Sequence, residues 1–347
     1  MITVVENEKD WGNVLKMVDT YDAYHTYGYH HVSKSNGEKP ILVIYEKQGC
    51  LIAIPLMLKA IRDTAHNDAT SAYGYCGPIS SNIGPDFNSR DFAHDLKNFL
   101  SEKAVASVFS RLNPFIPNQG VILKHSGTIE ALGQLINIDL TKSLESQRKV
   151  YNPRLKTYIN KCRKNYLIKD AGSEAEIKEL VSIYYENMLR VNAKDQYFFP
   201  GSYFLNLWKS TDFNTKFLLA YDKVSNDLAG GAIFTMTNDI VQYHLSGARK
   251  EYLRLNPIKV LIDDMRIKAT DKGFKYFNLG GGVGNNQDSL FRFKSGYSKD
   301  FKSFKIWKYI VDQQVYDELV TNRNIRCGYN SKSCQKFFPC YRCAFPR

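Results

Sequence analysis

The sequence lacks a long uncharged apolar run. The longest one, residues 49–58, falls well short of the roughly 20 residues that a membrane-spanning helix needs. The first ten residues also lack the basic stretch and apolar core of a secretory signal. The seven cysteines are odd in number and irregularly spaced, a pattern more typical of reduced thiols in a cytosol than of a disulfide framework. We therefore expect a soluble, cytoplasmic protein.

Acidic residues are absent from two segments of a chain whose net charge is +12. Residues 148–169 hold eight Lys or Arg and residues 321–347 hold six, which leaves the rest of the chain with a net charge of −2. Because its charge is nearly balanced elsewhere, the protein is not coated in positive charge for wrapping a nucleic-acid duplex, and DNA is not an expected partner. The two segments instead indicate local anion sites.

The sequence does have a hydrophobic content of 44% over 347 residues, enough for two domains. Its residue patterns predict the same string of hairpin, strand, helix and strand in each half. In the first half these elements are expected at 41–46, 51–58, 71–76, 89–103 and 105–111. In the second half they are expected at 216–221, 228–236, 240–246, 257–272 and 275–279, after a helix that begins at a capping box over 173–176. The repeated string predicts tandem copies of one α/β unit.

Two short segments of the second half carry candidate chemistry. The predicted strand at 240–246 has a polar row, Gln242, His244 and Ser246, which is by default a solvated face. If that row lines a cleft, His244 is the natural proton acceptor near neutral pH. The glycine-rich stretch 278–284 follows a strand, as a nucleotide-binding loop would. It matches neither G-x-G-x-x-G nor a Walker loop, so a tight turn is the simpler interpretation.

Aromatic and cysteine-bearing segments leave alternatives open. Tyr73 and Tyr75 lie among glycines, which suits stacking on a sugar or base as well as an ordinary turn. The segment 197–200 is more typical of a core than of a ligand platform. The four tail cysteines form one close pair, whereas structural zinc sites usually present two, so no metal is expected. These cysteines are Cys327, Cys334, Cys340 and Cys343.

Four motifs are informative in combination. They are Asp68-Ala-Thr-Ser with Tyr73-Gly-Tyr, Tyr243-His-Leu-Ser-Gly, Asn278-Leu-Gly-Gly-Gly and Asp288-Ser-Leu-Phe-Arg-Phe-Lys-Ser-Gly. Together they resemble the bacterial FemAB-type proteins, a branch of the GNAT acyltransferase superfamily. The resemblance extends from about residue 20 to about residue 345.

This resemblance implies an α/β fold of tandem GNAT-like domains, with two central, mainly antiparallel mixed sheets flanked by helices. We expect an N-terminal GNAT-like domain at 1–147 and a C-terminal GNAT domain with the acyl-donor site at 148–320. A basic, cysteine-containing tail at 321–347 is expected to pack on the fold. The implied activity is that of an acyltransferase, which moves an activated acyl group to an amine. No permanently bound cofactor is expected.

The resemblance also suggests where the site lies. His244 is the candidate base, and Lys294 lies where related peptidyl transferases have a lysine implicated in handling the charged intermediate. Substrate contacts are expected from the aromatic and acidic positions Asp68, Tyr73, Tyr75, Tyr197 and Phe198.

The acyl-donor region departs from the superfamily pattern. Ordinary GNAT enzymes hold the CoA pyrophosphate with a glycine signature that is missing from residues 247–256. Basic side chains and a helix N-terminus would have to bind the phosphates instead, and backbone N–H groups near residues 246–247 would serve the oxyanion. The expected donor-binding residues are Ser246, Gly247, Arg249, Lys250, Arg254, Asn256, Gly281 and Gly282.

Two enzymatic functions are expected from the resemblance. The first choice is transfer from acyl-CoA, as co-substrate, to a nucleotide-linked amino sugar for cell-surface polysaccharide synthesis. The family members that use tRNA often carry a long coiled-coil arm, and this chain has none. The alternative is an aminoacyl-tRNA-dependent transferase acting on a peptidoglycan precursor, in which residues 148–169 would bind RNA. A third, non-enzymatic function, nucleic-acid or zinc binding, rests on the tail alone.

Overall fold

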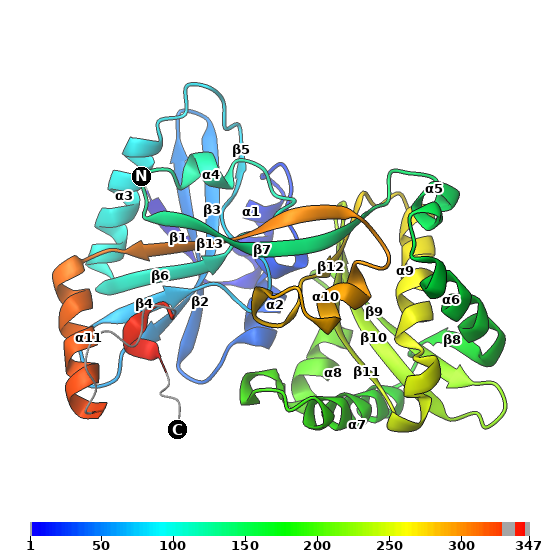
Figure 1. Ribbon diagram of the computed structural model, residues 1–347. Coiled ribbons are helices and arrows are strands. Elements are labelled where there is room, and N and C mark those ends of the chain that lie inside the picture. Colours follow the sequence, from blue (N-terminus) through cyan, green and yellow to red (C-terminus); the bar gives the residue numbers. More distant parts are fainter. Residues whose placement is uncertain (1, 328–336, 344–347) are drawn as a thin grey trace. The chain divides into compact units, whose positions relative to one another are not determined.

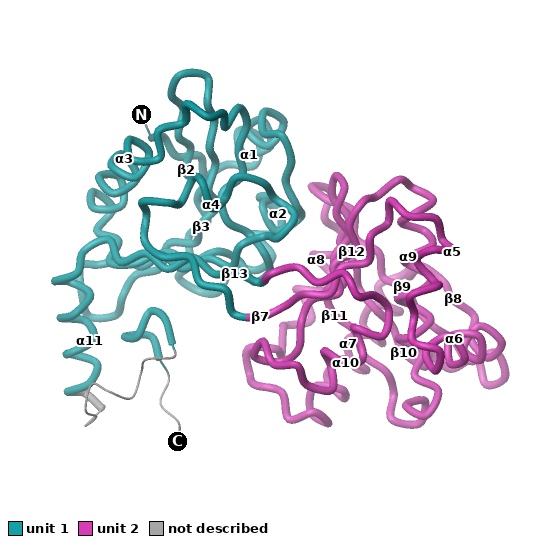
Figure 2. Tube along the Cα trace, turned by 45° about the horizontal axis from the view of Figure 1, so that its top comes forward, with its two compact units in different colours: residues 1–132, 304–347 teal, residues 133–303 magenta. Residues whose placement is uncertain are grey.

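The computed structural model describes residues 2–327 and 337–343, and the chain forms two compact units. Unit 1 comprises residues 1–132 and 304–347, and unit 2 comprises residues 133–303 (Figure 2). These units begin and end elsewhere than the boundaries expected at 147/148 and 320/321. The difference arises because strand β13 (Asp300–Ile310) returns the chain to unit 1, where it pairs with β6 (Val105–Arg111).

The sheet of unit 1 has the strand order β1-β2-β3-β4-β6-β13, and β5 also pairs with β3 (Figure 1). Its pairs are antiparallel except for β4 with β6. The remaining strands are β1 (Ile2–Val5), β2 (Glu38–Lys47), β3 (Cys50–Ala60), β4 (Asn67–Thr70) and β5 (Ile79–Ser81). The helices are α1 (Glu8–Leu15), α2 (Tyr27–Ser33), α3 (Ser89–Glu102), α4 (Gln119–Ile122) and α11 (Gln313–Cys327), with 3₁₀ turns η1 (Ala23–His25) and η6 (Cys340–Arg342).

The first-half elements lie where the sequence predicted them, except one strand. Helix α3 is capped by Asn88 and buries Phe92, Leu96 and Leu100 against the sheet core. The strand expected at 71–76 lies at 67–70 instead, and Gly74 within the expected range has a φ of +133°, which is not a strand conformation. A Cβ on Gly74 would lie 2.4 Å from the ring of Tyr24, so this loop is also closely packed.

Unit 2 contains a second sheet, ordered β7-β12-β11-β10-β9-β8, which is antiparallel except between β11 and β12. Its strands are β7 (Thr128–Asp139), β8 (Tyr166–Asp170), β9 (Asn214–Asp222), β10 (Leu228–Thr237), β11 (Ile240–Ala248) and β12 (Tyr276–Gly280). Its helices are α5 (Leu144–Lys149), α6 (Pro153–Asn165), α7 (Glu174–Arg190), α8 (Gly201–Lys209), α9 (Ile258–Asp271) and α10 (Ser289–Lys294), with η2 (Asp195–Tyr197), η3 (Lys250–Leu255) and η4 (Val283–Asn285). The expected α/β fold, with mainly antiparallel mixed strand pairing flanked by helices, is confirmed.

Helices α7 and α9 cover opposite faces of the second sheet (Figure 1). Two adjacent glycines on β10 show this, because successive strand residues face opposite sides. A Cβ on Gly230 would lie 3.1 Å from Pro257 at the start of α9, and a Cβ on Gly231 would lie 2.7 Å from Leu180 of α7. Small residues on β10 therefore let both helices approach the sheet closely.

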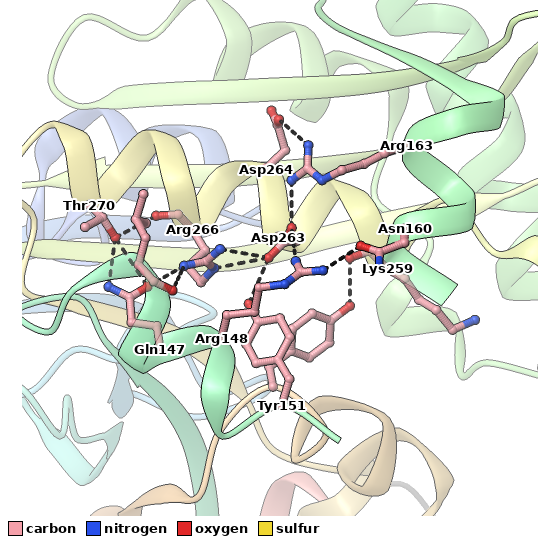
Figure 3. Close-up of polar contacts among 12 residues, drawn as sticks. Gln147, Arg148, Tyr151, Asn160, Arg163, Lys259, Asp263, Asp264, Arg266 and Thr270 are labelled. Carbon is pink, nitrogen blue, oxygen red and sulfur yellow. Dashed lines mark hydrogen bonds and ion pairs between the residues drawn. The ribbon is translucent and has the colours of Figure 1, made fainter. Parts of the chain in front are cut away.

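A buried carboxylate, Asp263 on α9, joins three segments of unit 2 (Figure 3). Its oxygens lie 2.6 Å from Arg163 of α6, 3.0 Å from Arg266 of α9 and 3.4 Å from Arg148 of α5. Tyr151 adds a hydrogen bond of 3.1 Å through its hydroxyl. Two of the eight cations in the predicted basic segment, Arg148 and Arg163, thus pair with one carboxylate of the protein rather than with an external anion.

Removal of this carboxylate should destabilise the protein strongly. In Asp263→Ala, three guanidinium groups would lose their shared partner, one of them fully buried, and we expect a loss of about 3–5 kcal/mol in the free energy of unfolding. Urea denaturation measures this loss. Asp271→Ala, at an exposed carboxylate on the same helix, is the matched control and should change stability by less than about 0.5 kcal/mol. Equal stability of the two variants would contradict the anchoring role of Asp263.

Candidate functional site

Strands β11 and β12 are paired only over their first three residues. Their parallel pairing covers Ile240–Gln242 and Tyr276–Asn278, and the last pair is reinforced by a side-chain bond of 2.8 Å from Asn278 to Gln242. Beyond it, β11 continues to Ala248 with no pairing to β12 in the part of the chain that the structure describes. We call the region after Gln242 and Asn278, where the two strands are no longer paired, the opening between β11 and β12.

A β-bulge lies at the same place. Ile233 of β10 pairs with Leu245, and the next residue, Phe234, pairs with Tyr243, so His244 is the extra residue on β11. A bulge re-aims the side chains of its strand. Tyr243 and Ser246 are joined by a hydrogen bond between their hydroxyls, although simple alternation places them on opposite faces. The prediction of a solvated polar row is wrong, because Gln242 is only 1% exposed and His244 is half-buried.

Lys294 lies on the Tyr243 side of this opening. It ends α10, whose first turn is capped by Asp288, and its side chain is buried. Its amine donates a 2.9 Å hydrogen bond to the carbonyl of Gly281, just after β12, and lies 5.6 Å from the centre of the Tyr243 ring. Burial lowers the pKa of Lys294 to about 8, an effect that the charge of Asp288 opposes. At neutral pH Lys294 is therefore a buried cation that loses its proton easily.

His244 faces α8 instead. Its Nε2 atom lies 2.6 Å from the hydroxyl of Tyr203, whose ring stacks on Phe199 at 4.5 Å. Burial lowers the pKa of His244 to about 4, so the imidazole is neutral at pH 7 and is a weaker base than an exposed histidine. The structure does not bring His244 into contact with Lys294 among the described residues. The sequence analysis did not predict Tyr203 as a site residue, because no local pattern links it to His244, which lies 41 residues further along the chain.

The three predicted donor-site glycines each have a packing reason. A Cβ on Gly247 would lie 2.9 Å from the Tyr184 backbone of α7, and one on Gly281 would lie 2.9 Å from the carbonyl of Gln134. A Cβ on Gly282 would overlap the backbone of Asn286 at 2.0 Å. Close backbone approach thus requires glycine at these positions, whether or not a ligand also lies there.

The predicted phosphate-binding residues divide into engaged and exposed groups. Arg249 binds Glu179 at 2.8 Å and the carbonyl of Leu228 at 2.9 Å. The side chains of Lys250 and Arg254 on η3 are exposed. Asn256 accepts a 2.9 Å bond from the N–H of Ile258 at the start of α9.

The predicted substrate-binding residues belong to two units. In unit 2, Tyr197 accepts a bond from Tyr184 through its carbonyl, and Phe198 stacks on Tyr185 at 6.2 Å. They cover α7 beside the Phe199–Tyr203 pair.

In unit 1, Asp68 is buried and forms a bidentate ion pair with Arg342, at 2.7 and 3.1 Å, that holds η6 of the tail. Tyr73 is 37% exposed with Arg111 over its ring, and Tyr75 packs edge-on against Phe304.

The tail cysteines are only partly described. Cys340 and Cys343 have intermediate exposure. Cys334 and the side chain of Cys327 lie outside the described residues. Within the described ranges, no group of three or more His, Cys, Asp or Glu side chains is placed to hold a metal ion. No helix in those ranges is long and apolar enough to cross a membrane.

Comparison with known proteins identifies the fold. No protein-family model matches the chain, and no curated protein matches it in sequence. FemX matches in structure with a TM-score of 0.71 and 11% identity, over 92% of this chain and 99% of that chain. A conserved protein of unknown function from Bacteroides thetaiotaomicron matches with a TM-score of 0.60 and 10% identity, over 89% and 100% of the chains. The expected FemAB-type fold is therefore confirmed.

A further match corrects the expected substrate. The C-terminal domain of a protein named as a lysylphosphatidylglycerol synthetase, from Agrobacterium fabrum, has a TM-score of 0.54 and 11% identity over 92% of this chain and 98% of that chain. Together with FemX, this match contradicts the first choice, acylation of a nucleotide-linked amino sugar, which is wrong.

The titration of Lys294 is directly measurable. NMR of protein labelled with isotopic lysine should show one side-chain amine that titrates near pH 8, and Lys294→Met should remove that signal. Because the folded pKa lies below the ordinary value of 10.5, the parent should gain stability relative to Lys294→Met as the pH rises from about 8 to 10.5. Lys97→Met, at an exposed lysine of α3, should leave the signal in place. A Lys294 signal that titrates only above pH 10 would contradict the buried environment described here.

Proposed function

We propose that this protein transfers an aminoacyl group from aminoacyl-tRNA to the amine of a peptidoglycan precursor. The observation that carries the proposal is the opening between β11 and β12, with the buried Lys294 ammonium beside it, in a chain whose fold matches FemX over nearly the whole of both chains. The resemblance of the Tyr243-His-Leu-Ser-Gly and Phe-Lys-Ser-Gly motifs to the FemAB-type proteins supports the same activity. Use of charged tRNA would place the reaction in the cytoplasm.

The chemistry requires three things of the site. The acceptor amine attacks the ester carbonyl carbon, the carbonyl oxygen becomes an oxyanion, and the C–O bond to the tRNA ribose then breaks. The amine loses a proton and the ribose hydroxyl gains one, so the reaction is balanced without a cofactor. Orientation of the two substrates alone can supply about 7–11 kcal/mol of the barrier.

Lys294 is suited to the oxyanion. Its charge is buried, so its interaction with a developing negative charge is weakly screened. The carbonyl of Gly281 and the ring of Tyr243 hold the amine at the opening. The backbone edge of β11 near Ser246 would donate an N–H group to the same oxygen.

His244 is suited to moving a proton rather than carrying a charge. Its imidazole is neutral at pH 7 because burial lowers its pKa to about 4. The 2.6 Å contact with Tyr203 gives a short path between the imidazole and a phenol hydroxyl. We propose that this pair accepts the proton of the attacking amine, directly or through water.

The donor is tested by direct competition. The purified protein is given a mixture of radiolabelled aminoacyl-tRNAs or acetyl-CoA with a soluble peptidoglycan precursor, and labelled precursor is measured. Transfer from aminoacyl-tRNA is expected, and binding of the tRNA should weaken steeply as salt is raised. Transfer from acetyl-CoA alone would overturn the proposed donor and restore acyl-CoA as co-substrate.

Two substitutions distinguish the roles of Lys294 and His244. Lys294→Met should lower kcat about 10²–10³-fold with little change in KM, because it removes a charge used in the transition state. Lys294→Arg should recover part of the rate. The parent should lose activity above about pH 8, where Lys294 loses its proton, and this pH dependence should be absent in Lys294→Met. His244→Ala should lower kcat about 10²–10⁴-fold. An unchanged kcat in either variant would remove that residue from the mechanism.

Lys124→Met is the matched control for these measurements. Lys124 is an exposed lysine of unit 1, outside the opening between β11 and β12. Its substitution should leave kcat, KM and the pH profile unchanged.

A further inference from the structure

The basic segment 148–169 forms two sets of cations with different partners. The inner set, Arg148 and Arg163, forms ion pairs with the buried Asp263 (Figure 3). The outer set points away from that carboxylate. We call its members the α6 cationic surface: Arg154, Lys161 and Lys164 of α6 and Lys259 of α9, with Tyr158 among them.

The outer cations have no carboxylate partner. No ion pair joins any of the four to an acid within residues 2–327 and 337–343. Arg154, Lys161 and Lys164 are exposed, and no acid occurs between residues 148 and 169 to offset them. Like charges three or four residues apart on a helix repel each other. The surface is therefore a site of unbalanced positive charge.

Tyr158 fixes two of these cations in place. The guanidinium of Arg154 lies 6.0 Å from the centre of its ring, and the amine of Lys259 lies 4.7 Å from it. Lys259 is half-buried, and its backbone carbonyl is held by the hydroxyl of Tyr297 at 3.0 Å. Figure 3 shows the Lys259 amine pointing away from the Asp263 network. These contacts limit the freedom of both side chains before any ligand binds.

Helix α6 is itself fixed to the domain. Leu155, Ile159 and Cys162 form its buried face in the core of unit 2. At its C-terminal end, the Tyr166 hydroxyl donates a 2.6 Å bond to the carbonyl of Leu255, which ties it to η3. The cations are thus presented on a rigid support, with Arg154 and Lys161 roughly 10 Å apart along the helix axis.

We propose that the α6 cationic surface binds the phosphodiester backbone of the tRNA donor. A row of this length can contact more than one phosphate of a strand, and Lys and Arg are the side chains that make such contacts. This inference rests on the proposed function, since tRNA is the donor proposed for the reaction. In this proposal the body of the tRNA lies against α6, and the acyl group lies at a different place, the opening between β11 and β12.

An anionic membrane is the less favoured occupant. Helices that lie on membranes expose an apolar face for insertion, whereas the apolar face of α6 is buried. Within residues 148–165, Val150 is the only large apolar side chain that the structure leaves exposed. The surface therefore has the positive charge that phosphate contacts require but lacks the apolar side chains that would insert into a membrane.

Binding of uncharged tRNA tests the surface independently of catalysis. The probe is unfractionated deacylated tRNA, and Kd is measured over a series of salt concentrations. Arg154→Glu/Lys161→Glu should weaken binding by about tenfold or more at low salt and make the slope of log K against log salt shallower by about two. Arg154→Gln/Lys161→Gln should give a smaller loss in the same direction. Circular dichroism checks that the variants remain folded.

The matched control changes the net charge equally at another place. Lys97→Glu/Lys124→Glu alters two exposed lysines of unit 1 and should leave the salt slope unchanged. Equal loss in both double variants would overturn the proposal, because net charge would then explain the binding. Binding of the parent to vesicles with anionic phosphatidylglycerol but not to tRNA would also overturn it, in favour of a membrane. If tRNA binds at α6 but no aminoacyl group is transferred, the surface stands and the proposed function fails.

Discussion

The function of unit 2 depends on the point at which β11 leaves β12. Up to Gln242 and Asn278 the strands are paired, and the bond between those two side chains closes the pairing. The bulge at His244 then changes which way each side chain of β11 points. Because of it, Tyr243 faces Lys294 while His244 faces Tyr203, and one strand serves two chemical environments. Burial then sets the protonation states of Lys294 and His244.

A similar constraint divides the basic side chains of residues 148–169 into two sets. A single buried carboxylate, Asp263, can compensate only the cations that reach it, which are those on the inner side of α5 and α6. The cations on the outer side of α6 are left without acids. A structural ion-pair network and a surface for an anionic partner thus come from the same stretch of chain. Composition alone presents that stretch as one basic segment.

Much of the fold was predictable from the sequence. The hairpins and the helices expected at 89–103 and 257–272 rest on local rules of periodicity, and they lie where expected. The strand expected at 71–76 lies at 67–70 instead, and Gly74 within the expected range has a positive φ that the local sequence does not specify. The nucleotide-sugar substrate was wrong, and it had rested on the absence of a long coiled-coil arm.

The sequence by itself determined the elements, their repeated order, the excess of positive charge in residues 148–169 and the motifs that resemble the FemAB-type proteins. Those features depend on neighbours within a few residues of one another. Only the tertiary structure decided that Asp68 binds Arg342, 274 residues away, that Lys294 reaches Gly281, and that His244 meets Tyr203. It also decided the pKa values of Lys294 and His244, since both are set by burial. Burial depends on which distant segments cover a side chain, and no local pattern carries that information.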